Sequence, residues 1–160
     1  MFTLPQLIDE DLKEIDGALH DLLSKSDATS ALLLDKGGFV ITQQGRADKF
    51  DATTVGALAA ASFCANMEIA NQVGERTFTN IYQQGESQSI LVSNVDEHCL
   101  VVVVFKALTG VGAVKYYAAG AIERISAQLK RAAARSPDAG LDLSVLNVAD
   151  TISIFKKKED

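Results

Sequence analysis

The sequence predicts an α+β fold in which helices pack on the faces of a five-stranded antiparallel sheet. Three segments, residues 7–25, 51–74 and 110–135, repeat apolar residues at helical spacing. Five short apolar segments lie between them, two after the first helix and three after the second. The predicted order is therefore α-β-β-α-β-β-β-α. Short turns join neighbouring strands, which favours antiparallel pairing.

The first helix, residues 7–25, is amphipathic. Its apolar stripe contains Ile8, Leu12, Ile15 and Leu19. Acidic side chains fill the positions that we interpret as facing outward near its start, where they complement the helix dipole. These positions are Asp9, Glu10, Asp11, Glu14 and Asp16.

A tight hairpin follows the first helix. Residues 31–34 and 39–43 are apolar, and Asp35-Lys36-Gly37-Gly38 between them supplies residues that tolerate a positive φ. A polar loop, residues 44–50, contains Arg46 and Lys49 and leads into the second helix. Such a loop beside an exposed helix is a natural place for partner contacts.

The helix at residues 51–74 is the unusual element, because it is apolar or small on nearly every side. Asp51 is its expected N-cap and Gly74 its stop. Its three stripes are Val55, Leu58, Ser62, Ala65 or Asn66, Ile69 and Val73; Gly56, Ala60, Phe63, Met67 and Ala70; and Ala57, Ala61, Cys64, Glu68 and Asn71. One alternative is a helix enclosed within a larger single domain. We favour the other, in which a second subunit or protein covers the exposed side.

The last three strands form a meander at residues 78–84, 89–94 and 99–105. Leu100–Phe105 is apolar without a break, which predicts the middle strand of the sheet. Residues 78–84 are half polar and predict an edge strand that can pair with a second copy of itself. After the third helix, apolar residues recur along 141–155, and we expect this tail to dock on the protein.

Composition indicates one ordinary globular domain. The chain has 160 residues, of which 48% are hydrophobic and 22% charged. Its net charge of −6 and dispersed basic residues argue against a nucleic-acid partner. No signal peptide or membrane-span pattern is present, so we expect a cytoplasmic protein without membrane contact. Cys64 and Cys99 lie in apolar segments and are expected to be buried free thiols.

No motif in the sequence predicts catalysis. A Walker loop and a Gly-x-Ser-x-Gly elbow are both absent, and the two histidines and two cysteines lack metal-ligand spacing. Gly110-Val111-Gly112 before the last helix could cradle a phosphate, but a plain helix entry explains it as well. We therefore expect a binding protein with no cofactor, no metal and no catalytic residue of its own.

The hairpin sequence Ala31-Leu32-Leu33-Leu34-Asp35-Lys36-Gly37-Gly38-Phe39-Val40 resembles the roadblock family, also called the dynein light chain roadblock family. The resemblance covers residues 8–135 and extends to Gly74-Glu75, Gln84-Gly85-Glu86, and Leu100–Phe105 followed by Val114-Lys115. Within the family it is most similar to the bacterial MglB type. The implied division is a roadblock domain at residues 1–135 and a C-terminal tail at 136–160.

This resemblance implies a homodimer that regulates a small Ras-like GTPase in cell polarity and motility. Such proteins accelerate GTP hydrolysis by remodelling the GTPase rather than by inserting an arginine. Roadblock dimers pair the third strand with its symmetry mate, which implicates Phe78, Asn80, Tyr82 and Gln84. They also bring the two central helices together, which implicates Ala57, Ala60, Ala61, Cys64 and Glu68 in contacts with the second copy or the GTPase.

Two other functions stay open at this stage. One is a roadblock scaffold subunit that bridges other proteins without affecting hydrolysis. The other is a small-molecule sensor or enzyme that uses a pocket between the sheet and its helices. The lack of a convergent polar cluster in the sequence disfavours this last alternative.

Overall fold

The computed structural model describes residues 4–135, and the predicted docking of the tail lies outside them. The predicted order of helices and strands is confirmed, with one 3-10 turn added before the second helix. The elements are α1 (Asp9–Ser26), β1 (Ser30–Asp35), β2 (Val40–Gly45), η1 (Ala47–Lys49), α2 (Ala52–Gln72), β3 (Asn80–Gln84), β4 (Gln88–Asn94), β5 (Cys99–Lys106) and α3 (Val111–Ala134).

The five strands form one antiparallel sheet in the order β2-β1-β5-β4-β3. The unbroken apolar strand β5 is central, as its sequence predicts, and pairs Val102 with Leu32 on one side and Val92 on the other. The half-polar strand β3 lies at an edge of the sheet, as its sequence predicts.

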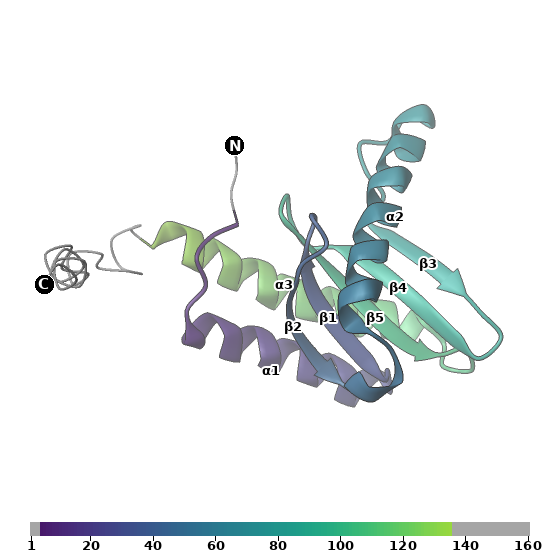
Figure 1. Cartoon of the computed structure of the whole chain (residues 1–160), viewed down its shortest axis with the longest axis horizontal. Helices are drawn as coiled ribbons and strands as arrows, with labels where there is room; N and C mark the ends of the chain where they lie inside the picture. The colour runs from purple at the N-terminus through teal and green to yellow at the C-terminus, as the bar shows by residue number, and fades with distance from the viewer. Residues whose placement is uncertain (1–3, 136–160) are drawn as a thin grey trace, which may run out of the picture.

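Helices cover both faces of the sheet, with α1 and α3 on one face and α2 alone on the other (Figure 1). Alternate side chains of β5 therefore enter two separate cores. Val101, Val103 and Phe105 pack with α1 and α3, whereas Leu100 and Val102 pack beneath α2. A strand buried on both faces needs apolar residues at every position, which explains the sequence of β5.

The start of α1 is joined to the end of α3 by a buried carboxylate. Asp11 was expected to face outward. This prediction is wrong, because Asp11 is 0% exposed. Asp11 accepts hydrogen bonds from the backbone N–H of Ile8 (2.8 Å), from Gln128 Nε2 (2.6 Å) and from both terminal nitrogens of Arg135 (2.8 and 2.5 Å). The Arg135 guanidinium is the main reason that the pKa of Asp11 is held well below its usual range.

Candidate protein-binding surface

Helix α2 rests on the sheet through a stripe of Gly, Ala and one Phe, and its large aliphatic side chains Leu58, Ile69 and Val73 stay exposed. Gly56, Ala60, Phe63 and Ala70 are buried. A Cβ added to Gly56 would lie 2.9 Å from Val40 Cγ2, so glycine lets the helix approach β2 closely. Asp51 caps the helix as predicted and accepts from the backbone N–H of Thr53 at 3.0 Å.

The strand-side flank of α2 consists of Val55, Leu58, Ala59 and Ser62, which face strands β3 and β4. These residues line a hollow of about 260 Å³ together with Gln83, Ile90 and Val92. Leu58 is 65% exposed at the rim of this hollow. The structure therefore leaves an apolar trough between α2 and the edge of the sheet.

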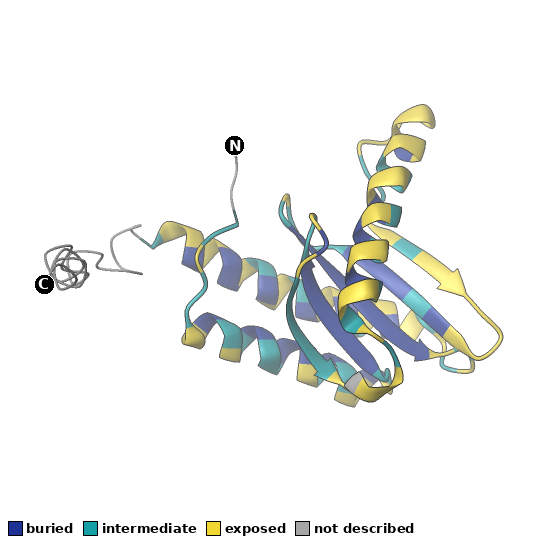
Figure 2. Cartoon of the chain, viewed as in Figure 1, coloured by how far each residue is buried: buried dark blue, intermediate teal, exposed yellow. Residues whose placement is uncertain are grey.

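The C-terminal end of α2 projects beyond the sheet and is exposed along most of its length (Figures 1 and 2). Ile69 is 52% exposed and Val73 65% exposed, and both belong to the same helical stripe as Leu58. Leu58, Ile69 and Val73 lie on one side of the helix with polar Ser62 and Asn66 between them, and exposed aliphatic residues on one side of a helix are typical of a protein contact. The stripe would otherwise lie in water.

The hairpin-side flank of α2 consists of Ala57, Ala61, Cys64 and Glu68, all of which are exposed. It lies on the opposite side of the buried stripe from the strand-side flank, as the helical spacing requires. Of the predicted partner contacts, Ala60 differs, because it is 3% exposed and packs in the core beneath α2. Ala60 is therefore not accessible to a partner in this conformation.

The β1–β2 hairpin lies directly against the hairpin-side flank. A Cβ on Gly38 would lie 2.9 Å from Ala57 Cα, and Gly38 has a φ of +99°. Lys36 Nζ donates to the backbone carbonyl of Asp96 (2.6 Å) and lies 5.6 Å from the centre of the Phe63 ring, and burial lowers its pKa. Lys36 therefore joins the hairpin to the β4–β5 turn by a hydrogen bond and to α2 through the Phe63 ring.

Phe39, at the tip of this hairpin, is 76% exposed. Its backbone N–H donates to Asp35 Oδ1 (3.0 Å), so the turn itself is well ordered by hydrogen bonds. Sequence reasoning treated Phe39 as the first residue of an apolar strand and missed it as a surface residue. Phe39 directly follows the Gly-Gly turn, and this position could have identified it as a surface residue.

The open edge of β3 presents the backbone groups of alternate residues. Asn94 N–H donates to the Thr79 carbonyl (2.9 Å) and Gly85 N–H to the Gln88 carbonyl (2.9 Å), which fixes the alternation along the strand. The odd-numbered residues of β3 direct their backbone N–H and C=O groups toward β4. Asn80, Tyr82 and Gln84 direct theirs toward the open edge.

The predicted strand is too long at its start. Phe78 is half-buried, lies two residues before β3 and takes part in no pair of the ladder. The Tyr82 ring stacks on Phe105 with centroids 6.1 Å apart, which places it on the face covered by α1 and α3. The free edge is therefore Asn80–Gln84.

The two cysteines differ in environment. Cys99 is a buried free thiol as expected, and burial is the main cause that raises its pKa to about 12. Cys64 was also expected to be buried, which is wrong, because it is exposed on the hairpin-side flank. A thiol at this position is a natural probe for anything that covers the flank.

The described residues contain no group of three or more His, Cys, Asp and Glu side chains that could hold a metal ion. No helix within residues 4–135 is long and apolar enough to cross a membrane. Four features of the surface are candidates for protein binding: the two flanks of α2, the hairpin tip and the β3 edge.

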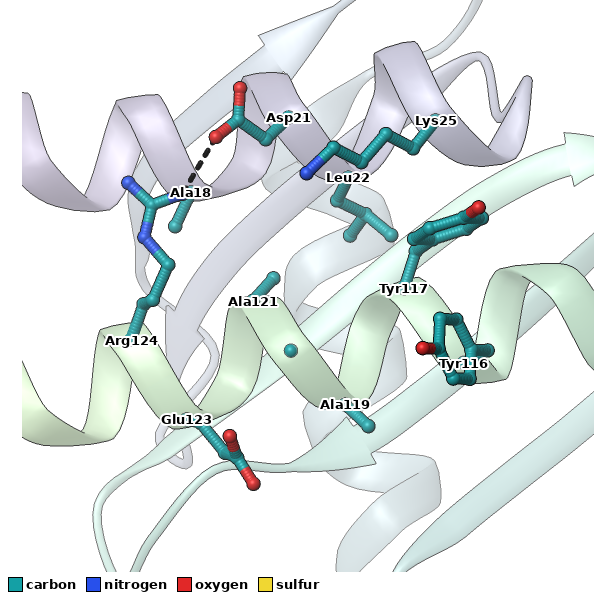
Figure 3. A pocket seen from close by; sticks show the side chains of 11 residues that line it. Ala18, Asp21, Leu22, Lys25, Tyr116, Tyr117, Ala119, Ala121, Glu123 and Arg124 are labelled. Atoms are coloured by element: carbon teal, nitrogen blue, oxygen red, sulfur yellow. Dashed lines mark hydrogen bonds and ion pairs between the residues drawn. The ribbon is translucent and has the colours of Figure 1, made fainter.

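A groove of about 480 Å³ also lies between α1 and α3, on the other face of the sheet (Figure 3). Its floor includes Ala18, Leu22 and Ala121, and Tyr117 closes one end. Arg124 at the other end is already paired with Asp21 (2.7 Å). Charges of both signs line this groove, so it selects no class of ligand by charge.

The chain folds as a small α+β domain with one helix exposed on both flanks and one open sheet edge. The profile of the Roadblock/LC7 domain matches residues 14–105, more than half of the chain. The chain therefore belongs to the Roadblock/LC7 family.

Among solved structures, the chain is similar to MglB proteins. It is 26% identical to an MglB described with a tetrameric arrangement, at a TM-score of 0.77, covering 82% of this chain and 99% of that one. It is 25% identical to the gliding protein MglB of Thermus thermophilus, at a TM-score of 0.76 and the same coverage. Myxococcus xanthus MglB shares the fold at 24% identity and a TM-score of 0.71, covering 74% and 96%. No curated protein sequence matches this chain.

Proposed function

We propose that this protein is a homodimeric regulator of a small Ras-like GTPase, of the kind that accelerates GTP hydrolysis in bacterial cell polarity or motility. The observation that carries the proposal is the exposed state of α2 on both flanks in a Roadblock/LC7 domain similar to MglB. Its place of action would be the cytoplasm. The working unit is the domain at residues 1–135, followed by the tail at 136–160.

The second copy occupies the strand-side flank and the β3 edge. The backbone N–H and C=O groups of Asn80, Tyr82 and Gln84 are oriented to add the same strand of a partner. Such pairing continues the sheet and brings the two α2 helices together over the trough lined by Leu58 and Ser62. A second helix there removes the exposed aliphatic stripe from water.

The GTPase occupies the hairpin-side flank, because that side of α2 stays open when the other is covered. Ala57, Ala61 and Cys64 are small, so a partner backbone can approach the helix closely. Glu68 supplies a carboxylate at one end of this flank, and Phe39 an exposed ring near the other. Aromatic residues of this kind are common anchors in protein interfaces.

Regulation follows from binding, because no catalytic group is needed on this protein. A surface of small residues next to a fixed hairpin selects one conformation of the switch regions of the GTPase. Stabilising the reactive conformation lowers the barrier to hydrolysis without an inserted arginine. The nucleotide, Mg²⁺ and the reacting water would all belong to the GTPase.

The same surface would serve a scaffold subunit that bridges other proteins. The scaffold alternative is supported by the similar MglB that has a tetrameric arrangement, because larger assemblies suit a scaffold. Single-turnover GTP hydrolysis by the cognate GTPase, with and without a molar excess of this protein, distinguishes the two. A regulator changes the rate, whereas a scaffold binds and leaves it unchanged.

A further inference from the structure

A pocket of about 340 Å³ lies where the loop after β2 leads into α2, and we call it the α2-entrance pocket. Its apolar walls are Phe50, Val55, Ile90 and Val104, and its exposed residues include Arg46 and Lys49. The volume is at the lower end of the range of about 300 to 1,000 Å³ that is usual for small-ligand pockets.

The loop that carries Arg46 is fixed to the sheet. Arg46 N–H donates to the Thr29 carbonyl (3.0 Å), and Ser30 Oγ donates to the Arg46 carbonyl (2.9 Å). Thr29 Oγ1 donates in turn to the Val104 carbonyl (2.9 Å). The hydroxyl groups in the lining are therefore used by the protein, and the walls offer mainly apolar surface.

The two cations at this pocket form no ion pair in the part of the chain that the structure describes. Within residues 4–135, neither Arg46 nor Lys49 makes an ion pair or a side-chain hydrogen bond. No Asp or Glu lines the pocket. The nearby Asp51 carboxylate is occupied by α2, because it accepts from Thr54 Oγ1 at 2.7 Å. By contrast, Arg124 and Arg135 are both paired with carboxylates.

An apolar cavity with two unpaired cations at its opening selects a ligand with an apolar body and an anionic head. We propose that the α2-entrance pocket binds a small amphiphilic anion, a medium-chain carboxylate, with its chain against Val104 and its head near Arg46 and Lys49. The opposite charge at the head is required, because the cations would repel an ammonium. The pocket shares Val55 and Ile90 with the trough that the second copy would cover. It is separate from the hairpin-side flank and does not depend on the proposed GTPase.

The probe is octanoate, titrated into the full chain and followed by the NMR signals of valine and isoleucine methyl groups. Val104 is the best reporter, because it lines this pocket but not the trough that the second copy would cover. We expect saturable shifts of Val104 with octanoate and no saturable shift with octylammonium, which has the same chain and the opposite charge. Equal responses to both probes, or no saturation with octanoate, would overturn the proposal.

Charge reversal provides the second test. We expect the double variant Arg46→Glu and Lys49→Glu to weaken octanoate binding by about tenfold or more. The control is Lys115→Glu with Lys130→Glu, which makes the same change in net charge at exposed positions on α3. Equal octanoate affinities of the two double variants would contradict a role for Arg46 and Lys49. If the first variant does not fold, the comparison of octanoate with octylammonium on the unmodified protein still decides the question.

Discussion

Replacing Leu58 with Ala should weaken dimerisation strongly while leaving the fold of the single chain intact. Full burial of a leucine side chain contributes about 2 kcal/mol. Leu58 is 65% exposed in the single chain, so covering it contributes roughly 1.3 kcal/mol per copy. A symmetric interface contains the residue twice, and the expected loss is about 2 to 3 kcal/mol, or roughly 30- to 150-fold in Kd.

Sedimentation equilibrium over a range of protein concentrations measures this Kd directly. The matched control is Leu108→Ala, which removes the same atoms from a residue that is 99% exposed in the loop between β5 and α3. The circular dichroism of both variants should match that of the unmodified chain. If Leu58→Ala and Leu108→Ala give the same Kd, the strand-side flank is not the dimer interface and the reasoning fails.

Three further predictions concern the edge strand, the buried carboxylate and the thiols. Gln84→Pro removes an N–H at the open edge of β3, so it should weaken the dimer in sedimentation while the chain stays folded. Gln83→Pro removes an N–H that is directed at β4, so it should also lower the melting temperature. Asp11→Asn should cost about 3 to 5 kcal/mol of unfolding free energy at pH 7, because it leaves the Arg135 charge without its partner. Because the native pKa of Asp11 is depressed, this stability is present above about pH 4 and lost as the pH falls further, so urea titrations of variant and native chain should converge in acid. Cys64 should react rapidly with a thiol reagent in the folded protein and Cys99 only on unfolding, and two equally fast thiols would contradict the buried Cys99.

The order of elements could be predicted because each one carries its own periodicity. An unbroken apolar run such as Leu100–Phe105 leaves only a central strand as its place in a sheet of this size. The half-polar sequence of β3 equally indicated an edge. Errors at the ends of elements, such as Phe78, arise because a turn and a strand share the same residue types.

The environment of individual side chains on helices was harder to predict. Leu58 and Ile69 are as hydrophobic as core residues, yet the buried stripe of α2 is made of Gly56, Ala60, Phe63 and Ala70. Close approach to the sheet decided the orientation of the helix, and packing distance cannot be read from one sequence. Asp11 was misplaced for a similar reason, because its partner Arg135 lies 124 residues away in the chain.

The measurement that tests the central claim most directly is single-turnover GTP hydrolysis by the cognate small GTPase in the presence of native protein and of two arginine variants. Ala61→Arg places a large charged side chain on the hairpin-side flank, and Ala119→Arg makes the same change at an exposed position on α3. We predict that the native protein and Ala119→Arg raise the rate tenfold or more, equivalent to about 1.4 kcal/mol, and that Ala61→Arg does not, although it still dimerises. An unchanged rate with the native protein despite binding, or full stimulation by Ala61→Arg, would contradict the account.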